Sequence, residues 1–265
     1  MRETNVSTSR LSKKKRWIFH QKSFLSYLSV LALWYLASRL GWFESTILPP
    51  PTEVIKTLIN LIVSGQLFAD AGISIWRVLV GFTIAAIIGI GFGILTASSS
   101  RFKEYGSPLL EILRPIPPVA FVPIAILWFG IGNGPAYFLV SFAAFFPIYT
   151  NTLAGILSVS QIHYDAALCL GAKRRLLLME VSLPASMPYL LAGLKTGLGT
   201  AWFVVIVAEL VGAQSGLGYM IQLNRLTLQS EKVLAGMIAI GFLGFSMNKG
   251  MSFLQKRFIP WYAES

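Results

Sequence analysis

The sequence predicts an all-α integral membrane protein with about six membrane-spanning helices. Hydrophobic residues make up 55% of the 265 residues, whereas charged residues make up only 12%. The apolar stretches are too long and too numerous for the core of a soluble protein of this size. A helix needs about 20 largely apolar residues to cross a bilayer. Several stretches approach or reach this length, and basic residues gather between them.

Six apolar segments are candidate membrane spans. In chain order they cover residues 24–40, 78–97, 115–131, 135–157, 188–211 and 233–253. The third begins beside Arg114 with Pro115, Pro117 and Pro118. Proline lacks a backbone N–H and clashes with the preceding helical turn, so we expect regular helix to break there unless neighbouring helices or water satisfy the freed carbonyls.

Residues 1–22 form a basic tail, and residues 23–265 form the transmembrane domain. The tail carries Arg2, Arg10, Lys13, Lys14, Lys15, Arg16 and Lys22. The positive-inside rule places this tail in the cytoplasm. Six crossings then bring the C-terminal end to the same side, together with Arg101, Lys103, Lys173, Arg174, Arg175, Lys256 and Arg257. A cleaved signal peptide is the alternative for 24–40, but this run is long and lacks a small-x-small cleavage site.

The net charge of +11 follows from this topology. We expect the basic residues to lie near membrane lipid headgroups. Nucleic-acid binding would require a soluble basic domain, and the sequence contains none. The sequence therefore predicts membrane lipid, and not nucleic acid, as a partner.

The sequence predicts no catalytic, metal-binding or cofactor-binding site on this chain. Cys169 is the only cysteine, which excludes an intramolecular disulfide, and His20 and His163 are too far apart to form a metal-ligand pattern. The Gly-x-x-x-x-Gly-Lys-Ser/Thr phosphate loop is also missing. The energy source for any active process is therefore expected on another chain.

A short amphipathic helix is predicted between the first two spans. Thr52 follows three prolines and can cap this helix, whose polar and apolar residues fall on opposite faces. We expect it to lie along the outer membrane surface, either as an anchor or as part of a landing site for a partner protein.

Small residues repeat every four positions in two of the spans. They are Ala85, Gly89, Gly93 and Ala97 in the second span, and Gly193, Gly197 and Ala201 in the fifth. Each stripe falls on one helix face and predicts close approach of another helix.

Polar and aromatic side chains inside the spans are candidates for a substrate pathway. They are Arg114, Tyr149, Thr150, Asn151, Trp202 and Glu209. Charged groups inside a bilayer are costly unless paired or hydrated, and the polar run 149–152 suits a water-lined cavity. The alternatives are structural: Arg114 and Lys195 can reach lipid headgroups, Trp202 can pack between helices, and Glu209 can pair with a cation or satisfy a broken backbone.

The polar segment 160–184, between the fourth and fifth spans, has a fixed internal spacing. Asp165-Ala166-Ala167 is followed by three residues, Gly171, nine residues, Val181, one residue and Leu183-Pro184. Helix-forming residues predict a helix with Asp165 in its first turn, where a carboxylate complements the macrodipole. Gly171 either ends this helix or lets a partner approach closely. The basic residues 173–175 also permit a surface helix anchored to anionic lipid.

This spacing resembles the cytoplasmic EAA loop of ATP-binding-cassette (ABC) importer permeases. Asp165 replaces the usual Glu, and Val181 replaces the usual Ile. The resemblance implies a coupling helix that inserts into a cleft of a separate ATPase subunit. The implied ATPase-coupling residues are Asp165, Ala166, Ala167, Gly171, Leu183 and Pro184.

Other stretches look like the nitrate, sulfonate and taurine permease family. They are residues 114–118, 126–132, 146–152, 207–209 and 215–219. The resemblance implies a type I ABC importer fold in a bacterial inner membrane and a homodimer of permeases. It also implies two ATPases that bind ATP and Mg²⁺ and an extracytoplasmic solute-binding protein. The intact Trp128-Phe129-Gly130 stretch looks closer to aliphatic-sulfonate members, and nitrate, taurine and bicarbonate are the alternative substrates.

Two other functional classes fit less well. A secondary transporter would carry its own ion-coupling residues and often an internal repeat. An intramembrane enzyme would need a nucleophile, metal ligands or a paired acid and base. Co-purification with an ATPase would distinguish an importer permease from both classes.

Overall fold

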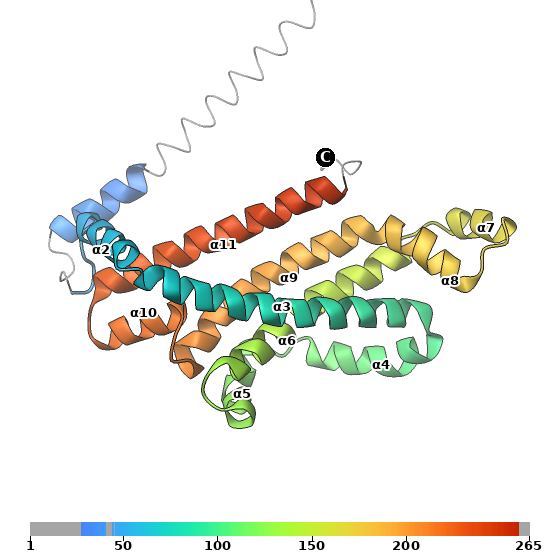
Figure 1. Ribbon diagram of the computed structural model, residues 1–265, viewed down its shortest axis with the longest axis horizontal. Coiled ribbons are helices and arrows are strands. Elements are labelled where there is room, and N and C mark those ends of the chain that lie inside the picture. The colour runs from blue at the N-terminus through green and yellow to red at the C-terminus, as the bar shows by residue number, and fades with distance from the viewer. Residues whose placement is uncertain (1–27, 41–43, 45, 260–265) are drawn as a thin grey trace, which may run out of the picture.

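Three long helices run side by side along the molecule. The computed structural model describes residues 28–40, 44 and 46–259, and these form helices and turns without a β-strand. Helices α3 (Gln66–Ser98), α6 (Asn133–Leu157) and α9 (Leu183–Gly212) follow the long axis, and α6 packs against both of the others (Figure 1). The predicted all-α fold class is confirmed.

Small residues allow these three helices to approach closely. A β-carbon added at Gly93 of α3 would lie 2.7 Å from the Thr152 side chain of α6. One added at Gly197 of α9 would lie 2.8 Å from the Ile148 side chain of α6. The two predicted stripes of small residues are therefore packing faces against α6.

Four helical segments are long and apolar enough to cross a membrane. They are α3, α6, the segment Leu177–Gly212 that contains α9, and α11 (Ser230–Phe258). They match the second, fourth, fifth and sixth predicted spans, although α3 begins at Gln66 rather than at residue 78. For the first predicted span, the described part is a shorter apolar helix, Leu28–Arg39, and residues 24–27 lie outside the described residues.

The third predicted span is part of a bent helix pair. Helix α4 (Ser100–Leu113) meets the segment formed by η1 (Pro118–Phe121) and α5 (Val122–Phe129) at 84°. Pro115 and Pro117 lie at the bend, where they cannot donate backbone hydrogen bonds. The predicted break at the prolines is confirmed, whereas a single helix over 115–131 is wrong. Counting this pair as one span raises the total to five among the described residues.

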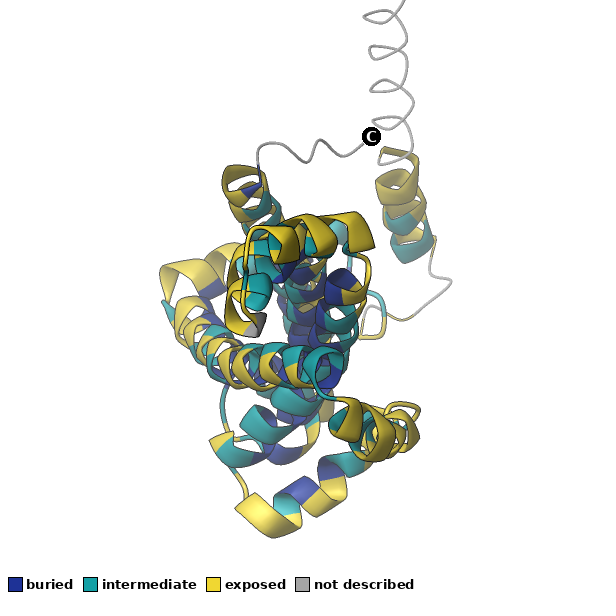
Figure 2. Cartoon of the chain, turned by 90° about the vertical axis from the view of Figure 1, so that its right-hand side faces the viewer, coloured by how far each residue is buried: buried dark blue, intermediate teal, exposed yellow. Residues whose placement is uncertain are grey.

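Different short helices lie at the two ends of the bundle. Helices α2 (Pro51–Val63) and α10 (Leu217–Leu226) are at one end, and α7 (Gln161–Cys169) and α8 (Arg174–Leu176) are at the other (Figure 1). Helix α2 begins at Pro51, so Thr52 lies inside its first turn and does not cap it as predicted. Seen from the α7 end, buried residues gather where the central helices face one another (Figure 2).

Candidate functional site

Residues 160–184, which we call the coupling segment, project from one end of the bundle (Figure 1). The segment contains α7, α8 and a π-helical turn, η2 (Leu177–Ser182), which leads directly into α9. Asp165 and Ala166 are exposed, and Ala167 is half-buried. Leu183 and Pro184 are the first two residues of α9, half-buried and exposed respectively. Two of the three motif residues on α7 are therefore accessible at the surface of the chain.

Asp165 does not lie in the first turn of its helix, as the sequence predicted. Helix α7 begins at Gln161, which makes Asp165 its fifth residue. The Asp165 carboxylate accepts a hydrogen bond from Gln161 Nε2 at 3.1 Å. Because the macrodipole acts mainly within the first turn, this side-chain bond replaces the predicted interaction with the helix N-terminus.

Gly171 ends α7 in a Schellman motif. The backbone N–H of Gly171 donates to the carbonyl of Leu168 at 2.9 Å, and that of Ala172 donates to the carbonyl of Ala167 at 3.0 Å. Gly171 has a φ of 80°, in the left-handed region that glycine adopts without steric cost. A β-carbon there would meet no atom within 4 Å. The helix-ending role is confirmed, and glycine is needed for its backbone conformation rather than for space within this chain.

Three predicted pathway residues line one cavity between η1, α6 and α9. This cavity of about 540 Å³ is bordered by Arg114, Thr150 and Asn151. Thr196 and Thr200 of α9 add hydroxyl groups to its wall. The cavity therefore combines one cation with several neutral polar groups, a combination that suits a small anion.

Arg114 is exposed and lies away from the end of the bundle that holds the coupling segment (Figure 1). It follows α4, whose 14 residues extend about 21 Å and run back along the bundle from the end that holds the coupling segment (Figure 1). Arg101 and Lys103 stand at the beginning of α4, so Arg114 is separated from them by most of the helix. Arg114 and those two residues therefore lie at opposite ends of α4.

The polar run 149–152 does not interrupt α6. The Thr150 hydroxyl donates to the Phe146 carbonyl at 2.9 Å, and Asn151 Nδ2 donates to the Pro147 carbonyl at 2.8 Å. These bonds satisfy carbonyls within the helix, which continues to Leu157. Tyr149 is buried, and it lines a neighbouring cavity of about 480 Å³ that Arg114 and Thr150 also border.

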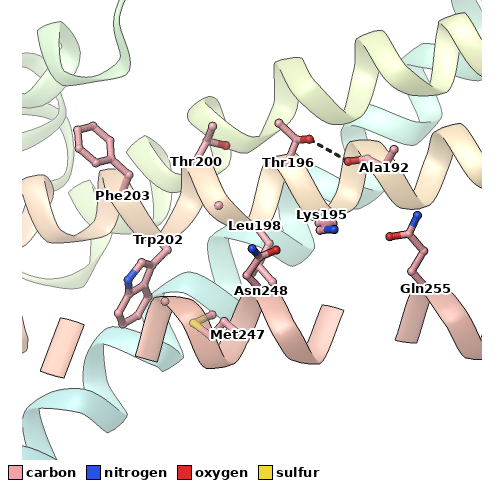
Figure 3. Close-up of a pocket in the computed structure, with 12 residues that line it drawn as sticks. Ala192, Lys195, Thr196, Leu198, Thr200, Trp202, Phe203, Met247, Asn248 and Gln255 are labelled. Carbon is pink, nitrogen blue, oxygen red and sulfur yellow. Dashed lines mark hydrogen bonds between the residues drawn. The ribbon is translucent and has the colours of Figure 1, made fainter. Parts of the chain in front are cut away.

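A third cavity, of about 710 Å³, lies between α9 and α11 (Figure 3). Lys195 of α9 and Asn248 of α11 border it, as does the predicted pathway residue Trp202. Trp202 Nε1 donates to the Ile240 carbonyl at 3.2 Å. A β-carbon added at Gly244 of α11 would lie 2.7 Å from that nitrogen. Trp202 therefore holds α11 against α9 at one end of this cavity.

The predicted pathway residue Glu209 lies in a buried polar cluster, apart from these cavities. Its carboxylate accepts hydrogen bonds from Arg77 at 2.8 Å, from the Ser74 hydroxyl at 2.9 Å and from the Gly218 N–H at 2.9 Å. The side chains of Arg77 and Glu209 are 2% and 0% exposed. Glu209 thus pairs with a cation and also satisfies a backbone donor, which are the two structural alternatives considered for it.

Arg77 is a structural residue that the sequence reasoning missed. Besides Glu209, it donates to Asn133 Oδ1 at 2.8 Å and to the Ser215 hydroxyl at 2.9 Å. It therefore ties α3 to the start of α6 and to the α9–α10 connection. The predicted span began at residue 78 and left Arg77 outside, although a lone arginine within an apolar helix is a recognisable signal.

Comparison with known proteins identifies the family of this chain. Residues 89–264 match the family described as binding-protein-dependent transport system inner membrane component. The chain is 36% identical to the putative aliphatic sulfonates transport permease protein SsuC of Bacillus subtilis (strain 168), over 98% of this chain and 94% of that protein. It belongs to this family. The chain is thus a multi-pass ABC importer permease, which excludes the secondary transporter and the intramembrane enzyme as classes.

Other members of the family are similar over most of this permease. The taurine transport system permease protein TauC of Escherichia coli (strain K12) is 36% identical, over 95% of this chain and 94% of that protein. The nitrate import permease protein NrtB of Leptolyngbya laminosa is 31% identical, over 79% of this chain and 78% of that protein.

Solved transporters share the fold of this permease. A chain of an amino acid ABC transporter crystallised with histidines aligns with a TM-score of 0.63 at 16% identity, covering 77% of this permease and 98% of that chain. A chain of the MetNI methionine ABC transporter, in an inward-facing conformation, gives a TM-score of 0.53 at 20% identity, covering 68% and 93%. The predicted type I importer fold is confirmed.

Proposed function

We propose that this permease imports a small anion, an aliphatic sulfonate, as the membrane subunit of an ATP-driven complex. The main support for this proposal is the similarity to the SsuC permease over 98% of this chain. The cavity bordered by Arg114 and four neutral polar side chains is consistent with an anionic solute. Taurine is the second candidate, because TauC is also 36% identical, and nitrate and bicarbonate are the remaining alternatives.

The proposed energy source is a pair of ATPase subunits that hold ATP and Mg²⁺ and bind the coupling segment. Support comes from the exposed Asp165 and Ala166 on α7 and from the Schellman motif that fixes the end of that helix. The implied role of Ala167, Gly171, Leu183 and Pro184 is to shape and place the same surface. No catalytic role is assigned to this chain.

The proposed pathway runs between two copies of the permease. None of the residues of α4 is buried, and Glu111 is exposed there, as is Arg114 just after it. Two charged side chains on a helix that runs along the bundle would be costly against lipid. Water or a second copy of the permease must therefore cover the side chains of Glu111 and Arg114. A homodimer with a water-filled passage between its subunits provides both kinds of cover.

Arg114, Tyr149, Thr150 and Asn151 are the candidate lining residues of this pathway. Trp202 and Glu209 receive structural roles, because their polar groups are used in contacts between helices. The coupling segment and both chain termini are assigned to the cytoplasm. The solute-binding protein is assigned to the opposite end, near α2 and α10.

Reconstitution tests this function directly. The permease, its ATPase and its binding protein would be placed in liposomes with labelled alkanesulfonate, taurine, nitrate or bicarbonate. We expect ATP-dependent uptake of the labelled alkanesulfonate. Unlabelled alkanesulfonate should inhibit this uptake more strongly than unlabelled taurine, nitrate or bicarbonate. Preferential uptake of another anion would change the substrate, and failure of the purified permease to recruit an ATPase would refute the docking role.

A further inference from the structure

Helix α7 touches the rest of the chain through a single narrow face. Of its nine residues, only Tyr164 and Ala167 are not exposed, and they are three positions apart, on one side of the helix. The Tyr164 hydroxyl lies 2.9 Å from the Ser182 hydroxyl. This hydrogen bond crosses from α7 to the last residue of η2.

The direction of this hydrogen bond can be assigned. The Ser182 hydroxyl donates to the Leu177 carbonyl at 3.0 Å. A hydroxyl has one proton to donate, so Tyr164 must be the donor and Ser182 the acceptor. Leu177 and Ser182 are the first and last residues of η2, so the Tyr164 contact completes a chain of bonds that spans the whole π-helical turn.

The π-helical turn η2, which Tyr164 contacts, leads directly into α9. Ser182 is 3% exposed and immediately precedes Leu183, where α9 begins. Single π-helical turns are uncommon and frequently mark functional positions in helices. Helix α9 continues from this turn to Thr196 and Thr200 on the wall of the cavity that Arg114 borders.

The beginning of α9 is also packed tightly against the end of α6. A β-carbon at Gly155 of α6 would lie 2.7 Å from Cβ of Tyr189 and 3.1 Å from Cβ of Ser186 in α9. This contact leaves little room for α9 to slide independently of α6. A displacement of α7 that reaches Ser182 is therefore passed to both helices of the cavity wall.

We propose that Tyr164 is a positioning residue that transmits movement of the docked α7 through Ser182 and η2 to α9. This inference rests on the proposed docking of α7 on an ATPase. Docking uses the exposed side of α7, whereas Tyr164 lies on the opposite, inward side. Loss of the Tyr164 hydroxyl therefore separates the transmission of movement from the binding of the ATPase.

The test is Tyr164→Phe, which removes the hydroxyl and keeps the ring. The control is Tyr105→Phe, the same change at an exposed tyrosine of α4. Ser182→Ala removes the acceptor, and Ser182→Thr keeps a hydroxyl as a rescue variant. Each permease would be reconstituted with its ATPase and binding protein, and the measurements are ATPase co-purification, ATP hydrolysis, and alkanesulfonate or taurine uptake per ATP hydrolysed.

We expect Tyr164→Phe to retain the ATPase and ATP hydrolysis but to lower uptake per ATP about fivefold, the factor that one net hydrogen bond represents. Ser182→Ala should act similarly, Ser182→Thr should restore uptake, and the double variant should lose no more than the worse single variant. Unchanged uptake per ATP in Tyr164→Phe would overturn the proposal. So would an equal loss in Tyr105→Phe, or reduced ATPase co-purification in Tyr164→Phe. A wild-type permease that recruits no ATPase would refute the docking role itself, and the role of Tyr164 with it.

Discussion

Arg77 and Arg114 are both arginines within the bundle, but their surroundings give them different roles. Arg77 is 1% exposed and is enclosed by acceptors from Asn133, Glu209 and Ser215. Arg114 is exposed and borders two cavities. An enclosed guanidinium fixes the helices that surround it, whereas one beside a cavity is free to contact a solute. Residue type alone does not separate these roles.

We predict that Arg77→Met destabilises the permease by about 3–5 kcal/mol, because it leaves the Glu209 carboxylate buried without its cation. Adding Glu209→Gln should recover part of this loss, since the amide oxygen can still accept a hydrogen bond without carrying a charge. Thermal unfolding of the detergent-purified protein measures both effects. Arg225→Met, at an exposed arginine of α10, is the control. An Arg77→Met midpoint equal to that of the control would contradict the structural role.

We predict that Arg114→Gln lowers anion uptake more than Arg114→Lys does, because lysine keeps the charge that offsets desolvation of the anion. Both variants should still assemble with the ATPase. Uptake and ATPase co-purification are measured together in liposomes. Equal loss of uptake in both variants, accompanied by poor assembly, would instead make Arg114 a structural residue.

At the scale of elements, two kinds of glycine serve different purposes. Gly93 lets α3 approach α6, where the Thr152 side chain occupies the space that a β-carbon would need. Gly171 has open space around it and ends α7 through its left-handed backbone. The first kind supports the packing of the bundle, and the second fixes where α7 ends.

We predict that Gly93→Leu destabilises the bundle by about 1–3 kcal/mol, the usual cost of overpacking. Gly91→Leu is the matched control on the same helix, because a β-carbon at Gly91 meets nothing within 4 Å. The thermal unfolding midpoint should fall for the first variant and change little for the second. A drop of the same size in both would mean that contact with α6 is not the cause.

We predict that Gly171→Val leaves the permease in the membrane but impairs ATPase co-purification and uptake. A left-handed conformation costs an ordinary L-residue roughly 1–2 kcal/mol, and β-branching adds to this strain. Asparagine tolerates the conformation better, so Gly171→Asn should retain more of both activities. Normal co-purification and uptake in Gly171→Val would remove Gly171 from the coupling role.

At the scale of the whole molecule, different features of the described chain lie at different levels along the bundle axis. The coupling segment lies at one end, and α2 and α10 lie at the other (Figure 1). The Arg77–Glu209 cluster fixes α3 to α9 near the α10 end, while cavities lie between the helices closer to the coupling segment. The buried ion pair and the cavities therefore occupy different levels along the bundle.

We predict that the purified permease alone hydrolyses no ATP, because its sequence has no phosphate-binding loop of the Gly-x-x-x-x-Gly-Lys-Ser/Thr type. Adding the partner ATPase should restore hydrolysis, and adding the binding protein with its solute should stimulate it further. Phosphate release is the measurement. Hydrolysis by the rigorously purified chain would overturn the assignment of the energy source to a partner.

The sequence alone determined the membrane class, the approximate spans, the small-residue packing faces and the two possible roles of Gly171, one of which is to end α7. These properties depend on hydrophobicity, residue size and backbone preference, which are local and can be read from neighbouring positions. The fixed spacing of the 160–184 segment identified its likeness to the EAA loop for the same reason, since all of its residues lie in one short stretch.

Only the tertiary structure decided which distant residues meet. Arg77 and Glu209 are far apart in the chain, as are Arg114 and Asn151, so no local pattern could show that the first two pair or that the second two share a cavity. The length of α4 places Arg114 well away from Arg101 and Lys103, although all three follow closely in the chain. Tyr164 and Ser182 likewise meet because α7 folds back toward η2. Contacts across folded helices depend on the relative placement of the elements, and that placement is a property of the packed bundle.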